Sequence, residues 1–373
     1  YAGTNDFGGN VTLTPGSGTI TVGAGGGTAQ FSAATGTQTL TSGGVTIPIL
    51  THTGAGTLQL TSALTSTTLT NSAGTLDLNG QALSLTAAAA VSNSGTIKLF
   101  GSETLTNVNN LDIDSGTVTY TGNNTTGTYA IKDFGTNDYY NLTFTDANAS
   151  KITLQLANTN TLTVAGNLTL SSGSGTFDNA TYDEAVNVTG DVTMDNTRTD
   201  MGDATWTTSG SFDNLSVTTF NQNLSTLVMN GTGKELISNS TTTPFYNLTI
   251  AEGATISQAS ASGTIKINGL ILVSGTLSIP TGKTTAVENS SGDIKITSTG
   301  NITGGGTFYV QHNVKLTQKD GVIDTTYLYI RNDHTASYPI LPSTYESANV
   351  LVLNDGGATN RTWLTSAGTY TFN

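Results

Sequence analysis

Residues 56–60 read Gly-Thr-Leu-Gln-Leu, and this short unit decides the fold. It returns as Gly-Thr-Leu-Asp-Leu at 74–78, Gly-Thr-Ile-Lys-Leu at 95–99 and Gly-Thr-Val-Thr-Tyr at 116–120, after an earlier copy at 18–22. Apolar and polar residues alternate in each copy, which predicts a strand with one buried face. With a degraded copy at Gly36, the glycines stand at positions 18, 36, 56, 74, 95 and 116. A nearly fixed step of about 20 residues is typical of repeat architectures.

These units predict an all-β parallel β-helix, or β-solenoid, with coils of about 20 residues, and about 18 turns if the whole chain coils. Three short faces joined by Gly, Asn or Asp corners use that many residues. We expect right-handed coiling, the default for parallel crossover connections. The six leucines and isoleucines Leu58, Leu60, Leu76, Leu78, Ile97 and Leu99 are predicted to point inward. The rival architecture is a string of β-sandwiches, which needs antiparallel strands every 8–12 residues.

The composition agrees with an all-β chain. Thr (75), Gly (44), Asn (34) and Ser (33) make up half of the 373 residues, and charged residues only 10%. Thr favours strands, and Gly and Asn favour turns. The net charge is −13, and 12 basic residues are scattered singly, so no nucleic-acid or anionic-membrane footprint is visible. The absence of cysteine excludes disulfides, thiolate zinc sites and a cysteine nucleophile.

The second half repeats less regularly. Gly-Thr or Gly-Asp units begin at Gly263, Gly275, Gly292 and Gly306, at shorter steps than those of the first half. We interpret these short steps as successive faces of the same coil. A further motif places an aromatic residue ahead of an alternating strand, at Tyr139, Phe212 and Phe245, which indicates wider, aromatic-filled cross-sections.

Three segments are expected. Residues 1–17 are predicted to be an N-terminal arm or cap, and residues 18–319 the solenoid. Residues 320–373 hold two of the three arginines and a Pro-containing loop, and are predicted to be a C-terminal β cap or docking module. No apolar stretch is long enough to span a bilayer as a helix.

The rungs quoted above, together with Gly-Asn-Leu-Thr-Leu at 166–170 and Phe-Tyr-Asn-Leu-Thr-Ile at 245–250, resemble the β-helical surface proteins of bacteria and archaea. These include haemagglutinin-like adhesins and autotransporter passenger domains. The resemblance covers roughly residues 10 to 315 and is one of style and period. It implies an extracellular stalk or adhesin, and it carries over no binding residue.

Candidate chemistry is sparse. An acidic group comprises Asp178, Asp183, Glu184, Asp191, Asp195, Asp200 and Asp203. A solvated loop is the favoured interpretation, with a calcium site and a catalytic carboxylate pair as alternatives. His52, His312 and His334 are isolated, so no zinc site is expected. We therefore predict no catalytic, cofactor-binding or metal-binding residues, no cofactor and no enzyme activity.

Sixteen Asn-x-Ser/Thr sequons are present, somewhat more than the roughly ten that composition predicts. In a glycosylating organism some would carry glycans on outward corners. They lie at Asn10, Asn123, Asn124, Asn141, Asn148, Asn167, Asn179, Asn187, Asn214, Asn223, Asn230, Asn239, Asn247, Asn289, Asn301 and Asn360.

Three functions remain open. The favoured one is a non-enzymatic structural or adhesive protein of the cell surface, self-associating into a filament or a longer rod, with a glycan or cell-surface receptor as a further partner. The second is a carbohydrate-binding module that stacks exposed aromatics, such as Tyr139, Tyr140, Trp206 or Phe245, on sugar rings. The third is a polysaccharide-degrading β-helix enzyme.

Overall fold

The computed structural model describes residues 3–13, 27–123, 125, 127–145, 152–155, 161–171, 175–238, 243–289, 292–311, 314–332 and 349–354. These residues form parallel strands and contain no helix. Accordingly, no helix in this part of the chain is long and apolar enough to cross a membrane. The strands stack as a β-solenoid of about 14 turns, which confirms the predicted fold class. The chain divides into two compact units, Tyr1–Asp178 and Asn179–Asn373.

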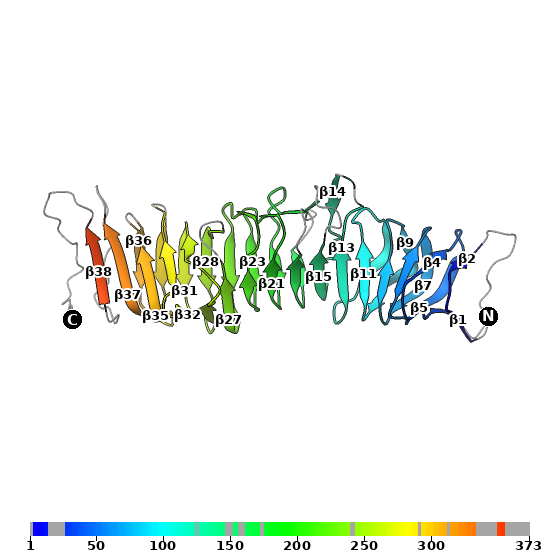
Figure 1. Ribbon diagram of the computed structural model, residues 1–373, viewed down its shortest axis with the longest axis horizontal. Helices are drawn as coiled ribbons and strands as arrows, with labels where there is room; N and C mark the ends of the chain where they lie inside the picture. The colour runs from blue at the N-terminus through cyan, green and yellow to red at the C-terminus, as the bar shows by residue number, and fades with distance from the viewer. Residues whose placement is uncertain are drawn as a thin grey trace. The chain divides into compact units, whose positions relative to one another are not determined.

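The first unit is built on two long ladders of parallel strands (Figure 1). One ladder contains β1 (Thr4–Phe7), β3 (Thr28–Phe31), β5 (Thr46–His52), β7 (Leu64–Asn71), β9 (Leu83–Ala90) and β12 (Leu105–Asn110), with β10 (Ser92–Asn93) beside β7. The other contains β2 (Val11–Thr12), β4 (Thr37–Thr41), β6 (Thr57–Leu60), β8 (Thr75–Asp77), β11 (Thr96–Leu99), β13 (Thr117–Tyr120), β15 (Asn141–Phe144) and β18 (Leu168–Leu170). Shorter strands are β14 (Gly127–Ala130), β16 (Ile152–Gln155), β17 (Leu162–Val164) and β19 (Thr176–Asp178).

The second unit has three main ladders. The first contains β21 (Val192–Met194), β24 (Phe212–Asp213), β27 (Thr232–Ile237), β29 (Thr255–Gln258), β32 (Thr276–Ser278), β35 (Asn301–Val310) and β37 (Val322–Asn332). The second contains β30 (Ile265–Ile267) and β33 (Thr284–Val287), then the later halves of β35 and β37, and β38 (Asn349–Asn354). The third contains β20 (Val186–Val188), β23 (Thr205–Thr208), β26 (Thr226–Met229), β28 (Asn247–Ile250), β31 (Leu270–Val273), β34 (Asp293–Ile296) and β36 (Lys315–Lys319). β22 (Arg198–Asp200) pairs with β25 (Thr219–Asn221).

The register of the first unit follows the Gly-Thr repeat. Thr37, Thr57, Thr75, Thr96 and Thr117 are successive partners in β4, β6, β8, β11 and β13, so their spacing is that of the glycines before them. The six residues predicted to point inward, Leu58, Leu60, Leu76, Leu78, Ile97 and Leu99, are all 0% exposed. Both predictions are confirmed for the described residues. The copy at 18–22 lies outside them.

The corner glycines are required by close approach between turns. A Cβ atom on Gly95 would lie 2.5 Å from the carbonyl oxygen of Gly74, well inside contact distance. Gly74 itself has φ +60°, a backbone conformation that residues other than glycine adopt only at a cost in free energy. Each turn can therefore sit directly on the one before it only because its corner lacks a side chain.

The predicted number of turns is wrong, and the cause is the length of the later turns. Leu142 of β15 pairs with Leu168 of β18, a longer step along the chain than the one from Leu58 to Leu76, because the connection carries additional loop. The short steps of the second half are explained as predicted. Gly263, Gly275, Gly292 and Gly306 precede strand segments of three different ladders, which are faces of the same coil.

Aromatic side chains fill the wider cross-sections. In the first unit the Tyr120 ring stacks on Phe144 with 5.8 Å between centroids, and Phe144 meets Phe177 edge-on at 5.1 Å. In the second unit Phe245 contacts both Phe212 and Phe220, at 5.8 and 5.9 Å. Offset and edge-on ring contacts of this kind add to the free energy gained from burying the rings.

The two ends of the sequence supply further strands. β1 pairs with β3 and β2 pairs with β4, both in parallel register, so residues 4–7 and 11–12 lie on the same ladders as the turns that follow. β37 and β38 likewise extend the ladders of the second unit beyond residue 320. Whether residues 1–17 and 320–373 act as caps stays a prediction.

Candidate functional site

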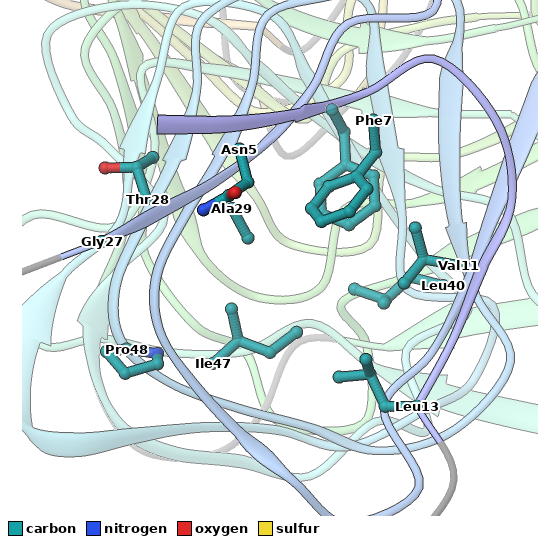
Figure 2. Close-up of a pocket in the computed structure, with 11 residues that line it drawn as sticks. Asn5, Phe7, Val11, Leu13, Gly27, Thr28, Ala29, Leu40, Ile47 and Pro48 are labelled. Atoms are coloured by element: carbon teal, nitrogen blue, oxygen red, sulfur yellow. The ribbon is translucent and has the colours of Figure 1, made fainter. Parts of the chain in front are cut away.

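An apolar hollow in the described residues lies at the first strands, β1 and β2 (Figure 2). Its lining is almost wholly apolar and comprises Asn5, Phe7, Val11, Leu13, Gly27, Thr28, Ala29, Phe31, Leu40, Ile47 and Pro48. The rings of Phe7 and Phe31 lie 5.5 Å apart along one wall. Leu40 and Ile47 close the floor and are themselves buried. The hollow is lined by apolar side chains of the first unit beside β1 and β2.

Two side chains hold the strands that frame this hollow. Gln38 occupies the inward position that leucine takes in the next turns, and its Nε2 donates to the carbonyl oxygens of Phe7 (2.7 Å) and Gly9. The Oδ1 atom of Asn10 accepts from the backbone N–H of Thr39 at 2.8 Å. Among the described residues β1 pairs only with β3, so the described part of the chain supplies no strand partner for the other edge of β1. An apolar hollow next to a free strand edge has the chemistry to accept another strand.

The acidic group does not form a shared site. Within the second unit, Asp183 accepts from the backbone N–H of Asp203 (2.6 Å), and Asp203 in turn from that of Leu224 (2.9 Å). Asp191 accepts from the N–H of Ser211 at 2.8 Å. Each carboxylate thus fastens the corner of the following turn. The described residues hold no group of three or more His, Asp or Glu side chains placed to bind a metal.

The other members of the acidic group have separate roles. Asp200 pairs with the Nε of Arg198 at 2.8 Å and also accepts from Asn221. Asp178, in the first unit, accepts from Gln155 at 2.6 Å. The backbone N–H of Glu184 donates to Asn179, and Asp195 is exposed.

Three of the four aromatics proposed for sugar stacking are buried, so that expectation is wrong for them. Tyr139, Trp206 and Phe245 are at most 2% exposed, and only Tyr140 is partly accessible. Trp206 lies at an inward position of β23, and its Nε1 donates to the carbonyl oxygen of Met201 at 3.0 Å. The Thr residues on either side of Trp206 in the sequence were the signal, since they mark strand alternation and not a solvent-exposed loop.

A buried polar cluster that sequence reasoning missed lies beside β13. The hydroxyls of Tyr120 and Tyr139 are 2.8 Å apart, and the phenol of Tyr120 also accepts from the backbone N–H of Lys132 at 2.9 Å. Glu103 accepts from three backbone N–H groups, those of Gly80, Phe100 and Gly101. The signal was the local density of charge at 132–138 in a chain that is otherwise poor in charge.

Asp138 is the most perturbed carboxyl group of this cluster. Burial raises its pKa from 3.8 to about 6, against the lowering effect of hydrogen bonds from the backbone N–H groups of Phe134 and Thr163, each 2.8 Å long. Burial likewise raises the pKa of both phenols and lowers that of Lys132. A carboxyl that titrates near pH 6 has the acidity of a general acid or base. However, Asp138, Tyr120 and Tyr139 are at most 1% exposed.

The single histidine within the described residues, His52, is part of a polar ladder in the core. Its Nδ1 lies 2.8 Å from the Oδ1 of Asn71, and burial lowers its pKa. His312 and His334 lie outside the described residues. Two sequon asparagines are also buried, Asn179 and Asn214, each 0% exposed, whereas Asn167, Asn187, Asn223 and Asn230 are exposed.

Comparison with known proteins gives no relative from which a function can be inferred. No family model, curated protein or solved structure matches the chain.

Proposed function

We propose that this protein is a non-enzymatic structural or adhesive component of a cell surface, located outside the cell. A solenoid of stacked, Thr-rich rungs is a stable extended scaffold that needs neither disulfides nor a metal. Asp183, Asp191 and Asp203 fasten corners, and Asp138, whose pKa is raised, is buried. The hydrogen bonds and the burial of these side chains are explained by a role in holding the scaffold together. This supports a structural function over a catalytic one.

The observation that carries the proposal is the apolar hollow beside the free edge of β1. An open solenoid edge tends to pair with another strand unless it is covered. We assign this edge to the C-terminal region of a second copy, which would add a strand in parallel with β1. The contact joins two different surfaces, so it repeats without closing and produces a filament. A glycan or protein receptor on another cell remains a further proposed partner of such a filament.

Electron microscopy of the purified chain tests the filament directly. Phe7→Lys places a charge in the wall of the hollow, and Thr4→Lys places the same charge at an exposed position of the same strand. We expect the Phe7 variant to lose end-to-end polymers and the Thr4 variant to keep them. Removal of residues 1–14 should have the effect of the Phe7 change. Filaments of unchanged length and stability after the truncation, or an intact protein that is strictly monomeric at high concentration, would refute this mode of assembly.

Immunolabelling of intact cells of the source organism tests the location. Surface labelling without permeabilisation is expected, and labelling that appears only after permeabilisation would overturn the proposed location.

A further inference from the structure

The turns formed by residues 27–111 are almost free of exposed charge. The sequence has only three charged residues in this segment: Asp77, Lys98 and Glu103. Glu103 is 1% exposed, and Asp77 is 3% exposed and paired with the Nζ of Lys98 at 3.1 Å. Lys98 is therefore the one charged side chain that this segment presents in part to solvent. We call residues 27–111 the neutral segment.

The neutral segment also lacks glycosylation sequons. One sequon lies before it, at Asn10, and the other fifteen begin at Asn123 or later. Six asparagines fall between residues 11 and 122, and none is followed by the x-Ser/Thr pattern. Any N-linked glycan on this chain is thus attached outside the neutral segment.

One side of the segment carries no charge at all. It is formed by the outward side chains of β5, β7, β9 and β12, a surface we call the neutral face. Thr, Ser and Ala predominate there, with Thr67, Thr68 and Ala88 among the exposed residues. The hydroxyl of Thr86 donates to that of Thr67 at 3.1 Å, so equivalent side chains are aligned from one turn to the next. The ladder that contains β8 and β11 does carry charge, because Asp77 and Lys98 lie on its outward side.

From these observations we infer that the neutral face is a self-association surface, which packs side by side against the same face of a second copy. Each copy carries a net charge of −13, so two copies repel each other wherever charged surfaces meet. The neutral face is where that cost is smallest. Small and β-branched side chains on two sheets can interdigitate at the usual sheet spacing of about 10 Å. No aromatic side chain lies outward on these four strands to stack on a sugar ring, which favours a second copy over a polysaccharide.

The size of the face sets the strength of the contact. Four strands about 4.8 Å apart and six to eight residues long, at about 3.3 Å per residue, give at most about 500 Å² per copy. The total of about 1,000 Å² is at the low end for a specific interface, so an isolated pair is weak. Arrayed in the proposed filament, many such contacts act together and bundle neighbouring filaments. The pairwise contact itself does not require the filament.

Cysteine cross-linking tests the pair, because the chain has no cysteine of its own. Thr68→Cys lies on the neutral face, and Thr205→Cys is an exposed strand threonine of β23 in the second unit. Contact between identical faces brings equivalent residues of the two copies together near the symmetry axis. We expect mild oxidation to give disulfide-linked dimers for Thr68→Cys, or for Thr67→Cys or Ala88→Cys beside it, at several times the yield of Thr205→Cys.

Sedimentation equilibrium supplies the second measurement. Thr68→Glu and Thr205→Glu add the same single charge, and both positions are exposed, so both variants should fold. Thr68→Glu is expected to weaken dimerisation at least tenfold, and Thr205→Glu to leave it unchanged. Equal cross-linking at the two sites, equal dissociation constants for the two Glu variants, or an intact protein that stays monomeric at millimolar concentration would each overturn the inference. The Phe7→Lys variant separates the two proposals, since it should lose filaments and keep the cross-link on the neutral face.

Discussion

Asn71 and Asn93 lie one above the other in consecutive turns of the core, with the Nδ2 of Asn71 donating to the Oδ1 of Asn93 at 2.7 Å. Asn71 also accepts from the Nδ1 of His52 in the turn before, which fixes the ring tautomer. All three side chains are at most 1% exposed. Buried amides are tolerated here because each turn supplies the partner of the next, and the ladder in return ties the turns in register.

Breaking this ladder should destabilise the first unit. Asn71→Ala leaves the ring of His52 and the amide of Asn93 buried with fewer partners, and we expect a loss of roughly 1–3 kcal/mol in the free energy of unfolding. Thr70→Ala, on the outward side of the same strand, should change it little. Urea denaturation followed by circular dichroism measures both, and equal effects would show that the ladder contributes nothing specific.

The inward leucines provide the second prediction. Leu76 is 0% exposed and lies between Leu58 and Ile97 in the register. Leu76→Asp places an unpaired carboxylate in the core, so the free energy of unfolding should fall by roughly 3 kcal/mol or more. Thr75→Asp, one residue away on the outward side, should fold normally. Hydrogen exchange localises the effect: we expect loss of protection in β6, β8 and β11, and protection unchanged from wild type would be evidence against the assigned register.

The fold could be predicted from the sequence because two simple signals agree. Alternation within Gly56–Leu60 and its relatives gives the inward face, and the spacing of the glycines gives the length of the turn. Both signals are local and survive in almost every copy. The number of turns could not be predicted, because loop length is not constrained by packing and increases from β13 to β18.

The site was harder to predict. Asp138 and Glu103 read as ordinary surface carboxylates, and their burial depends on loops between strands that no periodicity describes. Trp206 was expected to be exposed because the alternation of the threonines on either side of it was not read as a strand, although Trp206 takes an inward position of β23. The neutral face needed the structure, which shows that Asp77 and Lys98 lie on the other ladder.

The acidic side chains at the corners provide a prediction about stability. Asp183 has φ +57° and accepts from the N–H of Asp203, so its role is to hold a corner. Asp183→Ala should lower the free energy of unfolding by about 1–2 kcal/mol, since it loses the hydrogen bond and strains the backbone. Asp183→Asn keeps an acceptor and tolerates the conformation, so it should restore most of the loss.

No turnover of pectin, alginate or other uronates is expected from the wild-type chain or from the Asp183 and Asp191 variants. Absorbance of unsaturated uronate products and a reducing-end assay are the measurements. Robust turnover that Asp183→Ala or Asp191→Ala abolishes would contradict the structural role.

The last prediction concerns pH. The pKa of Asp138 is raised from 3.8 to about 6 in the folded protein, chiefly by burial. Between about pH 4 and pH 6 the folded state therefore holds a proton that the unfolded state has lost. The free energy of unfolding should fall by up to about 1.4 kcal/mol for each unit of rising pH across this window, and this contribution should level off above pH 6. The physical reason is that protonation, as the pH falls through 6, removes the free-energy cost of burying a charged carboxylate.

The titration of His52 changes the free energy of unfolding with pH in the opposite sense, so its contribution must be separated from that of Asp138. Its pKa is lowered by burial, so its contribution to stability is lost as the pH falls below the unfolded value of 6.5. His52→Asn removes this titration. The new amide can donate a hydrogen bond to Asn71, as Asn71 does to Asn93 in the next turn. In that background, Asp138→Asn should flatten the remaining dependence between pH 4 and pH 6. Urea midpoints at half-unit pH intervals give the slopes, and a slope that is the same with and without Asp138→Asn would mean that this carboxyl group is not the source.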